Sequence, residues 1–270
     1  MPELPEVETT VRGIQKHLTD QTVTAVVVRQ RQLRWPIPKT LSRIINNKTI
    51  ISVERRGKYI LLQFENGTLM IHLGMSGSLR MLPKDSLVEK HDHFDLVVSN
   101  NKCLRLRDPR RFGSVLWAND WQQHKLIKDL GPEPLLKDFN AEYLFAQSRK
   151  RKVAIKNLIM NSHIVVGVGN IYASEALFRA GVRPKRIAGK ITKAEADNLV
   201  KVIKDVLKEA IKQGGTTLKD FTASDGKPGY FKQKLAVYGR EGEPCLHCKT
   251  IIKQVTIGQR ASYYCPKCQK

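Results

Sequence analysis

The sequence of 270 residues lacks the features that mark several common classes of protein. No apolar run approaches the roughly 18–20 residues that a membrane span needs, so we expect no membrane partner. The first residues, MPELPEVETT, are acidic and contain no apolar core of the secretory type, so we expect no secretory signal and a cytoplasmic protein. The glycines of GVGN (167–170) do not extend to GxGxxG, and no P-loop Lys-Ser/Thr follows them, which excludes nucleotide binding there. We find no internal repeat.

Acidic residues are scarce relative to basic ones. The chain has 47 Lys and Arg against 25 Asp and Glu, a formal net charge of +22 at pH 7. Such a charge favours a polyanionic partner, which is DNA, RNA or, less readily, an anionic membrane. A solvated basic surface or a ribosome-associated protein is the alternative interpretation. Hydrophobic residues make up 41% of the chain, enough to build cores, so general disorder is excluded.

Cysteine is also scarce, but four of the five cysteines form a motif. The spacing Cys245-x2-Cys248-x16-Cys265-x2-Cys268 is typical of a zinc ribbon, in which two tight turns supply four thiolates. Protein fills all four positions, which favours a structural zinc over a catalytic ion or disulfides. Residues 236–270 are too few to fold on a hydrophobic core alone, so we expect metal binding to stabilise them.

Two further residues take their interpretation from the strands around them. Cys103 lies in CLRLR, and the alternation of apolar residues there predicts a half-buried strand thiol rather than a nucleophile. Arg260 lies between the two cysteine pairs, where a hairpin held by zinc can present it to a phosphate. An ordinary polar turn explains the same residues equally well.

Periodicity predicts three regions along the chain. Apolar residues at helical spacing predict a helix over 4–18. Short β-branched runs then predict strands at 22–28, 58–64, 68–73, 94–98, 103–107 and 113–117, which favours an antiparallel sandwich or barrel. From about residue 140 the pattern predicts helices at 152–160, 170–180 and 192–213, the last with a capping box formed by Thr192 and Glu195. A long loop is expected over 216–231.

The amino terminus carries a possible nucleophile. Methionine before proline is commonly removed, which leaves Pro2 with a free secondary amine. An α-amino group has a pKa of about 7.7–8.0, so part of it is neutral near pH 7 and can attack an aldehyde. Glu3 and Glu6 lie within one turn, in positions to move protons. A proline in the first turn of a helix, with glutamates favoured by the helix dipole, explains the same residues without chemistry.

Other candidate sites are weaker. GVGNIYASE (167–175) is a glycine turn before a helix, which can hold a phosphate or simply join two helices. His91 and His93 would share one face of a strand, but no third metal ligand is evident. Basic residues cluster at 55–58, 105–111 and 149–152, where they form either solvated faces or a groove that follows phosphates.

Ten longer motifs together resemble the bacterial formamidopyrimidine-DNA glycosylase family, and the resemblance runs end to end. They are PELPEVET (2–9), RRGKYILL (55–62), IHLGMSG (71–77), KHDH (90–93), DPRRFG (108–113), VGVGNIYASEALF (166–178), GGTTLKDF (214–221), DGKPGYF (225–231), VYGREGEPC (237–245) and QRASYYCPKCQ (259–269). The resemblance implies an α+β multidomain fold. It has an antiparallel β-sandwich with an N-terminal helix (1–131), a helix–two-turn–helix domain (132–235) with a lesion loop at 216–231, and a zinc finger (236–270).

The resemblance also implies the activity. It is that of a bifunctional DNA glycosylase and abasic-site lyase, which removes 8-oxoguanine and formamidopyrimidines from duplex DNA during base excision repair. The implied cofactor is one structural Zn²⁺ held by the four cysteines, with no organic cofactor. The implied partner is damaged double-stranded DNA. The protein would be a monomer in the bacterial cytoplasm, associated with the nucleoid through DNA binding.

Residue roles follow where the motifs match. Pro2 resembles the Schiff-base nucleophile, and Glu3, with Glu6 nearby, the acid that opens the sugar ring. Lys58 resembles the lysine of β-elimination, and Arg260 the arginine of δ-elimination. Met75, Arg110 and Phe112 match the residues that fill the gap left by a flipped base. Other matches to DNA-contacting positions are His72, His91, Arg151, Lys156, Asn170 and, in the lesion loop, Lys219.

Two rival interpretations remain open at this point. The endonuclease VIII branch of the same superfamily prefers oxidised pyrimidines, but PELPEVE and the Arg110–Phe112 pair favour the purine branch. A non-catalytic zinc-ribbon DNA-binding protein would not need Pro2, Glu3 and Lys58 together.

Overall fold

The computed structural model describes residues 2–215 and 235–270. Within these residues the chain forms two compact units, one of residues 2–128 with 213–215 and one of residues 129–212 with 235–270. In the described residues, no helix is both long and apolar enough to cross a membrane.

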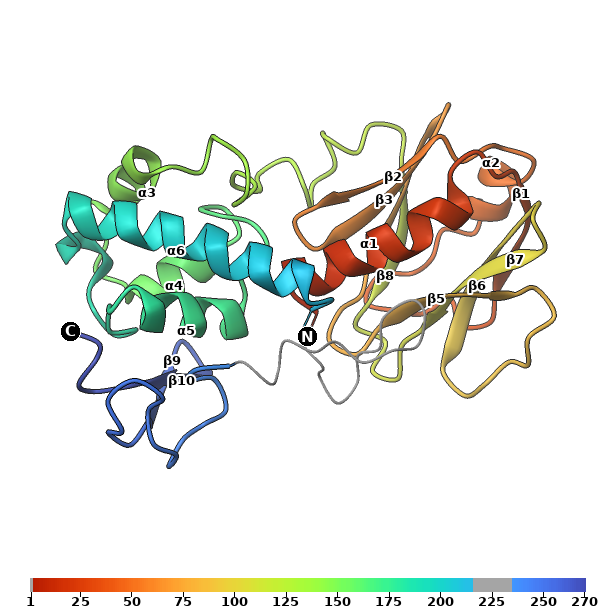
Figure 1. Ribbon diagram of the computed structural model, residues 1–270. Helices are drawn as coiled ribbons and strands as arrows, with labels where there is room; N and C mark the ends of the chain where they lie inside the picture. The colour runs from red at the N-terminus through yellow and green to blue at the C-terminus, as the bar shows by residue number, and fades with distance from the viewer. Residues whose placement is uncertain (1, 216–234) are drawn as a thin grey trace. The chain divides into compact units, whose positions relative to one another are not determined.

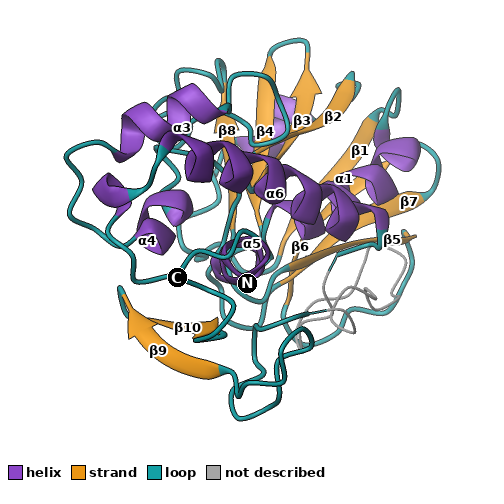
Figure 2. Ribbon diagram, turned by 60° about the vertical axis from the view of Figure 1, so that its left-hand side comes forward, coloured by secondary structure: helices purple, strands orange, loops and turns teal. Residues whose placement is uncertain are grey.

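The first unit is a sandwich of two antiparallel sheets (Figures 1 and 2). One sheet has the order β1-β6-β7-β5 and the other the order β2-β3-β4-β8. The strands are β1 (Val23–Val28), β2 (Ser52–Arg56), β3 (Tyr59–Phe64), β4 (Gly67–His72), β5 (Ser78–Pro83), β6 (Asp92–Val98), β7 (Lys102–Arg107) and β8 (Ser114–Ala118). The predicted antiparallel sandwich is therefore confirmed.

Helix α1 (Leu4–Leu18) lies along the sandwich and shares its core. Its residues Val7, Val11, Ile14 and Leu18 recur at helical spacing and are all buried. They pack in one cluster with inward residues of both sheets, such as Ile60 of β3. The helix predicted over 4–18 is thus confirmed, and the core fixes its amino-terminal end against the sandwich.

Three short elements of this unit did not emerge from periodicity. Strand β2 has the sequence SVERR, in which only Val53 is fully buried, and its pairing with β3 defines it. Strand β5 pairs with β7, and helix α2 (Leu41–Ile45) buries only its two ends.

Cys103 lies in a strand as predicted, but the prediction of half-burial was wrong. Both faces of β7 are covered from Cys103 to Arg105, and burial raises the pKa of the thiol.

The second unit combines helices with a two-stranded hairpin (Figure 2). Its elements are α3 (Ala141–Ser148), α4 (Ile155–Met160), α5 (Asn170–Arg179), the short 3₁₀ helix η1 (Ala188–Lys190), α6 (Lys193–Lys212), β9 (Lys253–Ile257) and β10 (Arg260–Tyr264). The predicted capping box is confirmed: the Thr192 N–H donates to Glu195 Oε2 at 2.8 Å, and the Glu195 N–H donates to Thr192 Oγ1 at 3.1 Å. Helix α4 begins later than predicted because Ala154 forms a β-bridge with Ile187.

Candidate active site and nucleic-acid interface

The start of α1 holds its polar residues in buried, bonded positions. Pro2, Glu3 and Glu6 are all buried, and Glu3 is the N-cap of the helix. The Glu3 N–H donates to Glu6 Oε2 at 2.8 Å, and the Glu3 side chain accepts from the Glu6 N–H in a reciprocal capping box. The helix cap therefore sets the direction of the Glu3 carboxylate next to Pro2.

The backbone at Gly215 lies directly against Glu6. Gly215 has φ +81°, and a Cβ there would lie 3.1 Å from Glu6 Oε1 and 3.4 Å from Glu6 Cα. A larger residue would therefore strain the backbone and press on the Glu6 side chain. The predicted lesion loop at 216–231 begins at the next residue, and that loop, with Lys219, lies outside the described residues.

The turn that carries Lys58 is tied to α1 by a partly buried ion pair. Arg55 of β2 donates through Nε to Glu8 Oε2 at 2.8 Å and through Nη1 to the Gly57 carbonyl at 3.0 Å. The Arg55 and Glu8 side chains are only 10% and 19% exposed. Burial raises the pKa of Glu8, but hydrogen bonds from Arg55 and Arg12 outweigh it and hold the pKa below its usual value. Sequence reasoning missed this pair, since the two residues are 47 positions apart.

His72, at the end of β4, is neutral near pH 7. Burial, with the positive charges of Lys58 and Arg34, lowers its pKa to about 4. The Gly74 N–H donates to His72 Nδ1 at 3.0 Å, which leaves the ring proton on Nε2, and the ring packs 4.9 Å from that of Tyr59. His72 therefore offers a neutral N–H donor beside two cations.

Met75, Arg110 and Phe112 come together on two adjacent loops, one between β4 and β5 and one between β7 and β8. Met75 and Phe112 are 39% and 42% exposed, which is high for large apolar side chains. The Arg110 guanidinium lies 4.9 Å from the centre of the Phe112 ring. Gly74 allows the two loops to touch, because a Cβ there would lie 2.3 Å from the backbone carbon of Phe112.

His91 does not lie where the strand pattern placed it. It precedes β6, with φ +76°, so the prediction that His91 and His93 share a strand face was wrong. Its ring lies 6.1 Å from that of His93, whose Nε2 is 2.9 Å from the Asp108 carbonyl oxygen. Among the described residues, only the four zinc-ribbon cysteines form a cluster able to hold a metal.

In the second unit, Lys156 and Asn170 fasten the hairpin to the helices. Lys156 of α4 is fully buried, and its Nζ donates to Asn170 Oδ1 at 2.6 Å, to Ser262 Oγ at 2.7 Å and to the Ala261 carbonyl at 3.2 Å. Asn170, the first residue of α5, donates from Nδ2 to the same Ala261 carbonyl at 3.0 Å. In this structure Lys156 thus bonds the strand that begins with Arg260.

Arg260 and Arg151 are both exposed in the second unit. Arg260 opens β10 directly after the Gly258–Gln259 turn, as expected for a residue at a hairpin tip. Arg151 follows α3 and donates through Nε to the Gln147 carbonyl at 3.3 Å.

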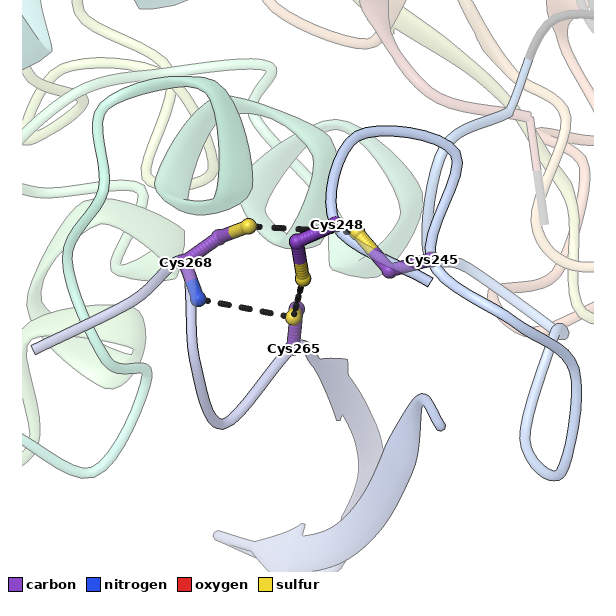
Figure 3. A group of neighbouring side chains, drawn as sticks. All are labelled: Cys245, Cys248, Cys265 and Cys268. Carbon is purple, nitrogen blue, oxygen red and sulfur yellow. Dashed lines mark hydrogen bonds between the residues drawn. The ribbon is translucent and has the colours of Figure 1, made fainter. Parts of the chain in front are cut away.

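The four zinc-ribbon cysteines converge on one point (Figure 3). Their sulfur atoms all lie within 4.8 Å of one another, with Cys245 and Cys268 at 3.9 Å and Cys248 and Cys265 at 3.4 Å. Zn–S bonds of about 2.3 Å place tetrahedral sulfurs about 3.8 Å apart, so the four thiols fit one zinc ion. Zinc binds cysteine as the thiolate, so loading this site releases protons and depends on pH. The four cysteines form a structural zinc site.

A buried carboxylate of α5 anchors the chain that leads into the ribbon. Glu175 is fully buried and accepts backbone N–H bonds from Ala236, Val237 and Tyr238 at 2.8, 3.0 and 2.9 Å. Sequence reasoning did not single out Glu175, although it ends the GVGNIYASE motif.

Comparison with known proteins covers nearly the whole chain. The family models that match are "Formamidopyrimidine-DNA glycosylase N-terminal domain" over residues 1–115, "Formamidopyrimidine-DNA glycosylase H2TH domain" over 130–222 and "Zinc finger found in FPG and IleRS" over 242–270. Formamidopyrimidine-DNA glycosylases of Thioalkalivibrio sulfidiphilus and Escherichia coli O6:H1 are 58% and 55% identical, each over 100% of both chains.

Solved structures agree with the sequence comparison. The MutM (Fpg) protein of Thermus thermophilus is 37% identical with a TM-score of 0.89, covering 99% of this chain and 98% of that one. The Lactococcus lactis Fpg, in complex with DNA containing an abasic site, is 30% identical with a TM-score of 0.91, covering 99% of each chain. The buried Pro2–Glu3 terminus, the two-sheet sandwich and the four-cysteine ribbon thus occur in a chain that belongs to the formamidopyrimidine-DNA glycosylase family.

Proposed function

We propose that the protein is a bifunctional DNA glycosylase and abasic-site lyase that excises 8-oxoguanine and formamidopyrimidines from duplex DNA during base excision repair. The observation that carries the proposal is the start of α1, where Pro2 is buried beside a Glu3 carboxylate whose direction is set by a reciprocal cap. Burying two carboxylates around the first turn is costly, and the reciprocal cap offsets this cost while it holds Glu3 beside Pro2.

In the proposed mechanism, the Pro2 nitrogen attacks C1′ of the damaged nucleotide, and the bond from C1′ to the base breaks with its electrons leaving on the base. Glu3 protonates the sugar ring oxygen, the ring opens, and the Pro2 nitrogen loses its proton as an iminium forms at C1′. The iminium acidifies the C2′ proton, and loss of that proton expels the 3′ phosphate with assistance from Lys58. A second elimination, assisted by Arg260, expels the 5′ phosphate. Water then releases the sugar fragment.

The loops of the first unit supply the proposed DNA deformation. Unstacking a base costs a few kcal/mol, and apolar wedges that fill the gap offset this cost. Met75 and Phe112 are the exposed apolar side chains suited to that role, and Arg110 can hydrogen-bond the orphaned cytosine. The proposed phosphate contacts are His72, His91, Arg151 and Asn170 together with Lys58 and Arg260. The buried Lys156 would act by holding the hairpin, and Lys219 would contact the flipped base.

We further propose functional boundaries at 1–131, 132–235 and 236–270, with the lesion loop at 216–231. The protein would act as a monomer in the bacterial cytoplasm, associated with the nucleoid through DNA. Zinc would take no part in the reaction, because its four protein ligands leave no coordination position open.

The test compares cleavage of three end-labelled duplexes, which carry 8-oxoguanine opposite cytosine, an oxidised pyrimidine, or a pre-formed abasic site. We expect the 8-oxoguanine strand to be cut to a one-nucleotide gap with phosphate at both ends. A preference for the oxidised pyrimidine would assign the protein to the endonuclease VIII type of activity, and binding without cleavage would overturn the proposal.

Glu3→Gln separates the two activities in the same assay. An abasic sugar already exists partly as an open aldehyde, so its cleavage does not need a group that protonates the ring oxygen. The variant should therefore lose 8-oxoguanine excision far more than abasic-site cleavage. Equal loss of both activities would contradict the role proposed for Glu3.

A further inference from the structure

Asp108 is fully buried in the sandwich unit, at the point where three loops meet. Its Oδ1 accepts from Ser76 Oγ at 2.8 Å, and its Oδ2 accepts from the Gly113 N–H at 2.7 Å. Ser76 Oγ in turn accepts from the Arg110 N–H at 3.2 Å. One carboxylate thus joins the loop that carries Met75 to the loop that carries Arg110 and Phe112.

The Asp108 backbone adds the third loop. Its N–H donates to the His91 carbonyl at 3.0 Å, and its carbonyl accepts from the Arg111 N–H at 3.1 Å and lies 2.9 Å from His93 Nε2. His91 and Arg111 both have positive φ, at +76° and +56°. This conformation is uncommon for residues with a side chain, and the backbone of each of these two residues bonds Asp108.

We infer that Asp108 is a positioning residue, which holds Met75, Arg110, Phe112 and His91 in one rigid arrangement before DNA binds. The inference rests on the proposed function, because it assigns Asp108 the task of presenting residues that fill the gap and read the opposite base. Asp108 is fully buried, so it would act through the residues that it positions and not by contact with DNA. Its effect is to reduce the entropy cost of ordering these three loops when DNA binds.

The role of Arg110 gives this inference a distinctive readout. A guanidinium with a fixed position can favour cytosine over adenine opposite the lesion, whereas a guanidinium that samples many positions cannot. Misplacement of a positioned group by about 1 Å can cost on the order of a hundredfold in rate. A defect at Asp108 should therefore lower the preference for cytosine, and not only the overall rate.

The experiment measures kcat and KM on 8-oxoguanine opposite cytosine and opposite adenine for Asp108→Ala, Asp108→Asn and Asp95→Asn. Asp95 is the matched control, because it is a carboxylate of the same sandwich that is 3% exposed and bonds Arg29 and Arg105 instead of the loops. We expect Asp108→Ala to lose on the order of tenfold or more in kcat/KM opposite cytosine, with the cytosine preference reduced. Asp108→Asn, which can keep the Gly113 bond, should recover part of both. Asp95→Asn should lower the melting temperature and keep the wild-type preference.

The inference is overturned if Asp108→Ala folds and keeps the wild-type preference, or if Asp95→Asn changes the preference equally. Should Asp108→Ala fail to fold, kcat/KM and the preference for cytosine are measured on Asp108→Asn and Ser76→Ala instead, because Ser76 links the carboxylate to the Arg110 backbone. A wild-type preference in both variants would overturn the inference. A wild-type protein that cuts neither duplex would instead refute the proposed function, so the two failures are distinguishable.

Discussion

At the scale of single residues, burial decides the protonation state of His72. A folded-state pKa near 4, against 6.5 for a free histidine, means that the folded protein binds this proton less well than the unfolded chain does. The stability contributed by neutral His72 is fully present above about pH 6.5 and is lost as pH falls toward 4. The difference corresponds to about 3 kcal/mol.

This shift predicts that His72 stays neutral wherever the enzyme works. An NMR titration of the ring protons should show no change for His72 between about pH 8 and 6, with Nε2 protonated throughout. The unfolding free energy of the wild type should fall between about pH 6.5 and 5, because the unfolded chain gains the His72 proton first. His72→Gln has no such proton, so its unfolding free energy should fall less over the same range. A His72 midpoint at or above 6.5 would contradict the buried, cation-flanked environment described above.

At the scale of secondary-structure elements, α1 and the β2–β3 turn are held together by Arg55. Its guanidinium bridges Glu8, on the helix that carries Pro2 and Glu3, and the Gly57 carbonyl next to Lys58. A planar guanidinium can satisfy both acceptors at once, which a lysine ammonium does with less geometric control. The pair therefore sets the turn that carries the proposed elimination lysine relative to the proposed nucleophile.

Arg55→Ala should slow strand cleavage more than it slows base release. We expect roughly a tenfold fall in the elimination rate, because Lys58 would lose its fixed position while Pro2 and Glu3 keep theirs. Arg12→Ala is the matched control. Arg12 bonds the other oxygen of Glu8 at 2.8 Å, but it is 63% exposed and its removal should change neither step. If Arg55→Ala and Arg12→Ala changed the ratio of strand-cleavage rate to base-release rate equally, Arg55 would not be the residue that positions Lys58.

The hairpin of β9 and β10 depends on zinc for its stability. Cys265→Ser should weaken DNA binding by more than it lowers the stability of the sandwich, because the ribbon has few buried apolar residues other than its ligands. Zinc content by elemental analysis, DNA affinity by fluorescence anisotropy and the melting of the sandwich test this prediction together. Retained zinc with unchanged affinity would be the contrary result.

Sequence patterns predicted these elements unevenly, and the reasons are physical. Apolar patterns identified α1, α5, α6 and six strands. Helices α1 and α6 each bury one stripe, whereas α5, β4, β6 and β7 are continuous runs buried on nearly all sides. It missed β2, because SVERR is defined by its partner strand, and Asp108, Arg55 and Glu175, because a buried polar residue is recognisable only through partners distant in sequence. Motif resemblance supplied roles for Pro2, Lys58 and Arg260 that periodicity could not supply.

At the scale of the whole molecule, the net charge of +22 overstates what is available to DNA. Arg105 is 3% exposed and bonds Asp95, Arg107 pairs with Glu89, and Arg149 bonds the Ile191 carbonyl. The basic clusters seen in the sequence are thus partly internal. Exposed residues such as Arg151 and Arg260 carry the charge that phosphates can reach.

The proposed DNA contacts predict a steep salt dependence. About 6–10 phosphate contacts should lower the affinity by roughly 10³–10⁵ between 50 and 200 mM salt. Arg260→Ala should reduce the slope of log K against log salt by about one, since one contact is removed. Fluorescence anisotropy across a salt series measures both quantities, and a nearly salt-independent affinity would be incompatible with these contacts.

The most direct test of the whole account is borohydride trapping, because borohydride reduces an iminium to a stable amine. Protein processed to begin at Pro2 is mixed with a duplex carrying 8-oxoguanine opposite cytosine and reduced during turnover. We predict a covalent protein–DNA adduct that peptide mapping assigns to Pro2 and that Lys58→Ala still forms. An adduct on a lysine, or no adduct from protein that binds the duplex, would contradict the claim that the N-terminal amine is the nucleophile.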